Sequence, residues 1–164
     1  MQIRFIVEDN GHKLLLSSFL PKGVSIQKVG SINEIDKNID LALTKKVDIV
    51  VGVIDNDKRK PSFLLKYAEL QARDNLVLMQ KNTNSNQKAF VIVIDPAVDK
   101  FIMENAENAE IELPNSISSF DLFKKRVKTL NSDRDNELIQ FISKIIRKKP
   151  AGFKTLADII NDIT

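Results

Sequence analysis

The amino-acid sequence predicts an α/β fold with a mainly parallel sheet of four or five strands that is flanked by helices. Over the first hundred residues, apolar runs of strand length alternate with segments of helical spacing, which is typical of βαβ units. The run 48–54 is a nearly continuous β-branched stretch, which favours a central strand covered on both faces. After Pro114 only helical spacing remains, so we expect a helical C-terminal part.

Short apolar runs rich in β-branched and aromatic residues indicate the strands, and apolar residues three or four positions apart indicate the helices. Pro21 and Gly23 end the first helix, and Ser31 begins the second with Glu34 at capping-box spacing. Pro61 is placed to start the third helix. The expected strands are 3–7, 24–29, 48–54, 76–79 and 90–94, and the expected helices are 13–20, 31–45, 61–73 and 97–106.

The chain is expected to divide into an α/β domain, residues 1–112, and a helical extension, residues 113–164, packed on it. Ser132 and Asp135 have the spacing of another capping box within the extension. Two basic runs also lie there, and they either neutralise phosphates or form solvated helix faces. The expected helices are 116–130, 133–148 and 154–163, and the basic runs are 124–128 and 147–154.

Composition limits the chemistry of the chain. Its 164 residues include no cysteine and one histidine, which excludes disulfides, cysteine nucleophiles and multi-histidine zinc sites. The formal net charge of +3 is too small to indicate a nucleic-acid-binding protein by itself. No apolar run approaches the ~20 residues of a membrane span, and no signal-peptide pattern is visible. We therefore expect a cytoplasmic protein without membrane contact.

Acidic residues follow three of the expected strands. They are Glu8 and Asp9 after the first strand, Asp55 and Asp57 after the third, and Asp95 after the fifth, with Asp99 on the next helix. Ligands of open parallel sheets bind beyond the carboxyl ends of the strands. Clustered carboxylates repel one another unless a cation lies between them, and oxygen ligands suit Mg²⁺ or Mn²⁺. The alternative is that Asp57 caps the next helix and Asp55 satisfies backbone donors.

Two of these segments resemble a known family. An acidic residue ends the first strand at 5–8, and a strand ends in Asp-x-Asp at 53–57, which resembles the TOPRIM domain of primases, topoisomerases and OLD-type nucleases. The order of elements also matches over roughly residues 3–95, and the segment 95–101 is similar to a helix start in stand-alone TOPRIM-like proteins. Asp9 stands where these proteins usually have glycine.

The resemblance implies an activity and assigns roles. Glu8 would be the general acid/base and Asp55 and Asp57 would bind Mg²⁺ or Mn²⁺, while Asp9, Asp95 and Asp99 would be accessory acids. The implied reaction is phosphodiester hydrolysis or phosphotransfer on nucleic acid. The implied partner is nucleic acid, or a partner protein in a defence complex. Lys58, Arg59 and Lys60, which follow Asp57, would contact phosphate, as would His12. The alternative is that the three basic residues form a solvated loop and that His12 is an exposed histidine without function.

A non-catalytic binding or signalling module is the alternative function. The segment 5–10 also resembles a response-regulator receiver domain, in which an aspartate ending the third strand, here Asp55, accepts a phosphoryl group. A receiver also needs a hydroxyl residue after the fourth strand, for which Thr83 is available, and a lysine after the fifth. This chain has Asp95 after the fifth strand, where a receiver domain has the lysine. An inactive TOPRIM relative is the other form of this alternative.

Overall fold

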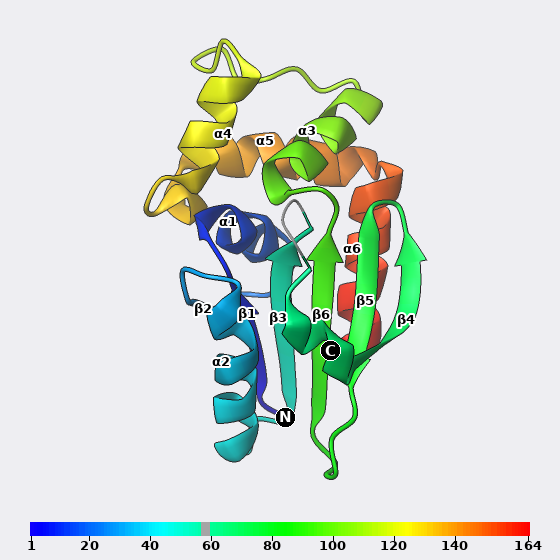
Figure 1. Ribbon diagram of the computed structural model, residues 1–164. Helices are drawn as coiled ribbons and strands as arrows, with labels where there is room; N and C mark the ends of the chain where they lie inside the picture. The colour runs from blue at the N-terminus through cyan, green and yellow to red at the C-terminus, as the bar shows by residue number, and fades with distance from the viewer. Residues whose placement is uncertain (57–59) are drawn as a thin grey trace.

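The structure is a computed structural model that describes residues 1–56 and 60–164. Its sheet has six strands in the order β2-β1-β3-β6-β5-β4 (Figure 1). The strands are β1 (Ile3–Val7), β2 (Ser25–Lys28), β3 (Ile49–Asp55), β4 (Tyr67–Arg73), β5 (Leu76–Lys81) and β6 (Lys88–Ile94). The helices are α1 (Asn10–Phe19), α2 (Asn33–Thr44), α3 (Val98–Asn108), α4 (Phe120–Lys128), α5 (Asn136–Lys148) and α6 (Ala151–Ile163), with short 3₁₀ helices η1 (Ser62–Lys66) and η2 (Ser132–Arg134).

The α/β class and the mostly parallel sheet are confirmed. Strands β2, β1, β3 and β6 run parallel to one another, whereas β5 is antiparallel to both β6 and β4. Every residue of β3 is buried, as expected for a central strand covered on both faces. The prediction of four or five strands was too low, because β4 extends the sheet.

The helix expected over 61–73 was wrong. Residues 62–66 form the 3₁₀ helix η1, and the chain then continues into β4 at the edge of the sheet. The apolar spacing of residues such as Leu64 and Leu70 suggested a helical face, but Leu70 is 53% exposed on β4. Asp74 and Asn75 have φ values of 51° and 62°, so they form a two-residue turn of the kind that joins antiparallel strands.

Two expected capping boxes do not form. The N-cap of α2 is Ile32, which makes no side-chain capping bond, so Ser31 does not act as the cap. Asp135, rather than Ser132, caps α5 by accepting hydrogen bonds from the backbone N–H groups of Glu137 and Leu138. Helix α5 therefore begins at Asn136, and Ser132 lies in the preceding 3₁₀ helix η2.

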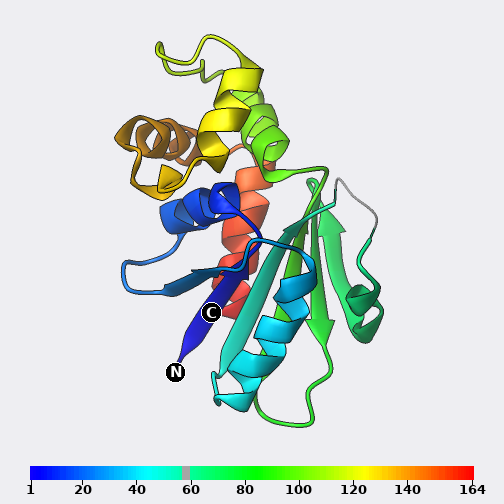
Figure 2. The same ribbon diagram turned by 60° about the vertical axis from the view of Figure 1, so that its left-hand side comes forward.

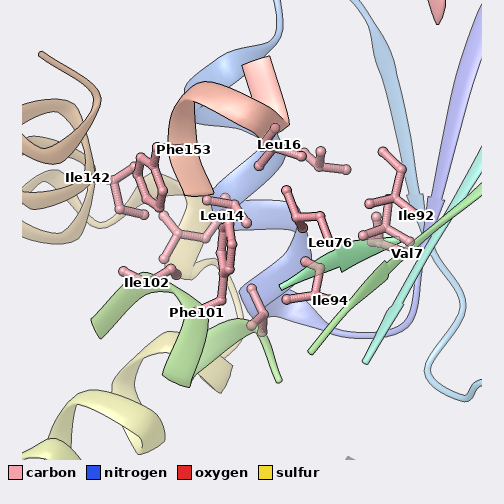
Figure 3. Close-up of a cluster of buried hydrophobic side chains, with 14 of the residues drawn as sticks. Val7, Leu14, Leu16, Leu76, Ile92, Ile94, Phe101, Ile102, Ile142 and Phe153 are labelled. Carbon is pink, nitrogen blue, oxygen red and sulfur yellow. The ribbon is translucent and has the colours of Figure 1, made fainter. Parts of the chain in front are cut away.

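Helices cover both faces of the sheet (Figures 1 and 2). Helix α2 packs on one face, where its side chains lie against β3, while α1 and α6 lie on the opposite face. The core on the α1 side joins strand residues such as Val7 and Ile92 to Phe101, Ile142 and Phe153 of the later helices (Figure 3). Helices of the C-terminal part therefore share a core with the sheet. Within the described residues, none of the helices has the length and apolar character needed to cross a membrane.

Glycine at position 52 is what allows α2 to approach β3 closely. A Cβ atom there would lie 2.8 Å from Cγ2 of Ile35 and 3.1 Å from Cδ1 of Ile39. We therefore expect Gly52→Ala to lower the free energy of unfolding by about 1–3 kcal/mol, as overpacking does. Chemical denaturation checks this, with Gly52→Ala/Ile35→Ala as the control, because the double variant should lose less than the sum of the two single variants. Purely additive losses would contradict it.

Candidate functional site

Three side chains meet where β1 and β3 end. Strands β1 and β3 are parallel, with Val7 opposite Val53, so the residues that follow β1 lie beside the end of β3. Asp9 is the N-cap of α1 and accepts a hydrogen bond from the backbone N–H of His12. Because His12 lies one turn beyond that cap, its imidazole reaches Asp55, the last residue of β3.

The imidazole of His12 bridges two carboxylates. Its Nδ1 lies 2.9 Å from Oδ1 of Asp9, and its Nε2 lies 2.8 Å from Oδ1 of Asp55. His12 is fully buried and Asp55 is 7% exposed. The same oxygen of Asp55 accepts a hydrogen bond of 2.9 Å from the backbone N–H of Val98, the first residue of α3. The cluster therefore connects α1, β3 and α3.

The two carboxylates stabilise the protonated form of His12, and His12 in turn stabilises the ionised form of Asp9. Burial by itself would lower the pKa of His12, but the hydrogen bonds and charges of Asp55 and Asp9 outweigh burial and raise this pKa to about 10. Burial would likewise raise the pKa of Asp9, but the hydrogen bonds and charge of His12 outweigh it and lower this pKa to about 2. His12 is therefore an imidazolium that donates from both ring nitrogens at neutral pH.

These pKa shifts predict a pH-dependent stability. The folded pKa of His12 exceeds its ordinary value of 6.5, so its contribution is complete below pH 6.5 and is lost as the pH rises toward 10. The folded pKa of Asp9 lies below 3.8, so its contribution is complete above pH 3.8 and is lost as the pH falls toward 2. We expect the free energy of unfolding to decline above pH 6.5, in denaturant titrations at several pH values.

The decline in the free energy of unfolding above pH 6.5 can be assigned to His12, because the chain has a single histidine. In a His12→Gln variant, the free energy of unfolding should no longer show the decline that begins at pH 6.5. A stability that stays constant in the wild type from pH 6.5 through the alkaline range would contradict the bridging imidazolium.

The structure describes four of the other predicted residues, namely Glu8, Asp95, Asp99 and Lys60. Glu8 is partly buried directly after β1, and its carbonyl oxygen accepts a hydrogen bond from Gly30. Asp95 follows β6, and its Oδ1 accepts a hydrogen bond from the amide of Asn56. Asp99 is 1% exposed in the first turn of α3, with Oδ2 at 4.0 Å from Nζ of Lys124. Lys60 is exposed, whereas Asp57, Lys58 and Arg59 fall outside the described residues.

One group among the described residues has the arrangement of metal ligands. It consists of Asp9, His12 and Asp55, whose possible ligand atoms lie within 4.8 Å of one another. Glu8, Asp95 and Asp99 are not members of this group. Sequence reasoning placed His12 near the site but expected an exposed side chain, and the structure buries it completely. The spacing of three residues from the cap Asp9 was the available signal, since it carries His12 one turn into α1.

The basic run at 124–128 is divided between two roles. The guanidinium of Arg126 contacts both oxygens of Asp135, at 2.8 and 3.0 Å, and also Glu137, so it joins α4 to α5. Lys124 lies beside Asp99, and the charge of Lys128 contributes to lowering the pKa of Asp9. Helix α4 therefore places Lys124 beside Asp99 of α3 and Lys128 near enough to Asp9 to act on its charge.

Comparison of this chain with protein families, curated proteins and solved structures gave no match. The chemistry of the donors is therefore what indicates a ligand. Both ring nitrogens of His12 are engaged with carboxylates, which leaves carboxylate oxygens as the donors while the imidazole is protonated. Such donors fit Mg²⁺ or Mn²⁺, whereas a nitrogen-seeking ion would have to displace a proton from His12.

Proposed function

We propose that this protein is TOPRIM-like and binds Mg²⁺ or Mn²⁺ at the carboxyl ends of β1, β3 and β6 to hydrolyse or transfer phosphodiester bonds of nucleic acid. The bridging of Asp9 and Asp55 by His12 is the observation that carries this proposal. It gathers acidic side chains at the edge of a parallel sheet, where ligands of such sheets bind.

The balance of charge at this edge favours a cation. Glu8 and Asp95 follow the strands on either side of β3, and Asp55 and Asp9 are held by one imidazolium. Two carboxylates thus share the single imidazolium of His12. Since a carboxylate has two oxygens, the imidazolium and a metal ion can share Asp55, as second partners of metal ligands commonly do.

In this proposal the chain's residues have separate tasks. A bound Mg²⁺ would polarise a phosphate and lower the pKa of a water molecule. Asp55 and Asp57 would hold the ion, Asp9 and His12 would orient Asp55, and Glu8 would transfer the proton. Lys60 would contact the phosphate backbone, together with the neighbouring Lys58 and Arg59.

Titration with Mg²⁺ and Mn²⁺ by calorimetry and NMR tests the proposal. We expect saturable binding in the wild type and its loss in Asp55→Asn. Asp162→Asn is the matched control, because Asp162 is an exposed aspartate in the last turn of α6 and is not a member of the acidic cluster. Nuclease assays on RNA and DNA would follow with the same variants. No binding at millimolar metal would exclude a cation-dependent enzyme.

The alternative is a non-catalytic binding module in which His12 takes the place of the metal ion. Its support is that the imidazolium already lies between Asp9 and Asp55 at hydrogen-bond distance from each. This alternative expects no metal binding in the wild type and a gain of binding in His12→Gln, because the substitution removes the internal cation. The two functions thus predict opposite results for the wild type.

A further inference from the structure

A hollow of about 510 Å³ opens on the α2 face of the sheet, opposite the face on which Asp55 contacts α1 and α3. Its floor is made by Val77, Met79 and Val93, on the neighbouring strands β5 and β6. Its wall is the chain from Lys60 through η1, which lies in front of β6 on the side of the sheet where α2 packs (Figure 1). This volume falls in the usual range for sites that bind small molecules.

The hollow begins at the same edge of the sheet as the acidic site. Asn56, directly after Asp55, lines it, and the amide of Asn56 donates to Asp95. Val77 pairs with Val93, two residues before Asp95, so the floor starts next to the ends of β3 and β6. Met79 pairs with Glu69 farther from the carboxyl ends of β3 and β6, and these two residues line the other end of the hollow. A molecule lying here would have one end at the acidic edge.

We propose that this hollow binds the base of a nucleotide whose phosphate lies at the carboxyl ends of β3 and β6, next to Asn56 and Asp95. The inference rests on the proposed function and names the substrate part that would fill the hollow. It also implies a substrate whose base is free of pairing, namely a mononucleotide, a strand end or an unpaired base, since a paired base cannot enter a hollow.

The shape of the floor fits a flat ring. Side chains from two adjacent strands of a sheet form a level apolar surface, and Val77 and Met79 remain partly exposed on it. Methionine adapts its shape and makes favourable contacts with aromatic rings. Tyr67 closes one end, and its hydroxyl donates to Asp36, which fixes its ring in place.

The polar groups at the rim fit the edge of a base rather than a hydrocarbon. Asn56, Ser62 and Glu69 offer an amide, a hydroxyl and a carboxylate around the apolar floor. Together these groups can donate and accept hydrogen bonds, as the edges of nucleobases require. Lys60 lies at the same rim, and its positive charge suits the phosphate of a nucleotide. An apolar side chain of a protein partner would leave these groups without hydrogen bonds.

The three methionines provide a direct test. With ¹³C-labelled methionine methyl groups, Met79 reports on the hollow, while exposed Met1 and Met103 on α3 are internal controls. We expect adenosine, guanosine, cytidine or uridine at millimolar concentration to shift the Met79 signal selectively. We also expect an intermolecular NOE between this methyl group and protons of the base. Ribose 5-phosphate, which lacks the base, should leave Met79 unchanged.

Two variants locate the binding. Val77→Phe should fill the hollow and abolish the Met79 shift, whereas Val77→Ile should retain it. The Met1 and Met103 signals show whether each variant is folded, and the NOE in the wild type requires no variant. No selective response of Met79 to any of the four nucleosides would overturn the proposal, as would an equal response to ribose 5-phosphate or a response that persists in Val77→Phe.

This test is independent of the metal titration. Nucleosides carry no phosphate, and no divalent cation is added, so a failure of the cation site leaves the expected Met79 response unchanged. A selective response in a protein that binds no metal would support a nucleotide-binding module. Metal binding without a response of Met79 would leave the cation site in place and exclude the base from this hollow.

Discussion

Replacing His12 by glutamine is expected to lower the free energy of unfolding by about 3–5 kcal/mol, because removing one partner leaves buried charges uncompensated. His12 has no exposed surface, and the carboxylate of Asp55 beside it is 7% exposed. Glutamine has a similar length but carries no charge, and it donates from one amide nitrogen rather than from two ring nitrogens on opposite sides of a ring. Asp55 would keep the hydrogen bond from Val98, while the charge of Asp9 would lose its partner within α1.

An exposed ion pair is the matched comparison. Lys37 lies 2.9 Å from Glu34 on α2, but the side chains are 72% and 43% exposed. Lys37→Gln should therefore cost less than about 1 kcal/mol. The two variants are compared by chemical denaturation near neutral pH. A cost for His12→Gln as small as that for Lys37→Gln would show that the imidazolium does not hold the cluster together.

A double variant separates the charge pair from simple loss of packing. With Asp9→Asn, one of the two carboxylates that contact His12 is neutralised, so adding His12→Gln should cost less than it does in the wild type. An interaction free energy near zero in this cycle would assign the loss to packing instead. The cycle also bears on function, since the proposed role of His12 is to orient carboxylates.

Much of the sheet follows from local sequence, because buried parallel strands need continuous apolar runs. β3 and β6 have such runs, and both were predicted at nearly their observed bounds. β4 could not be found this way, because an edge strand buries little and in this one Tyr67 alone is classed as buried. A bulge between Glu69 and Gln71 also interrupts the alternation of side chains between the two faces of β4. The turn at 74–75 was its clearest sequence feature.

The candidate site was predictable in position but not in its contacts. That acidic residues follow β1, β3 and β6 can be read from the sequence, since those strand ends share one edge. The burial of His12 cannot be read in this way, because it depends on distant parts of the chain. Asn10 donates a hydrogen bond to the carbonyl oxygen of Lys128, and Ser132 donates to that of Asn10, so the C-terminal part covers the start of α1.

Phe153→Ala is expected to lower the free energy of unfolding by about 3–5 kcal/mol, the usual cost of removing a buried aromatic ring. Phe153 lies in the first turn of α6 and is 1% exposed. The centroid of its ring lies 5.3 Å from the ring centroid of Phe19 on α1 and 5.7 Å from that of Phe101 on α3. The loss should appear by circular dichroism in denaturant, with Phe153→Leu as a control that removes less volume and costs less.

The form of that transition tests whether residues 113–164 are a separate unit. Because Phe153 packs on helices that directly cover the sheet, its loss should weaken sheet and helices together, and unfolding should remain a single transition by both far-ultraviolet dichroism and NMR of β3 and β6. An extension that folds by itself would instead unfold first and leave the signals of the sheet intact. Since the same C-terminal segment covers the start of α1, a single transition would also mean that the site around His12 exists only when these helices are in place.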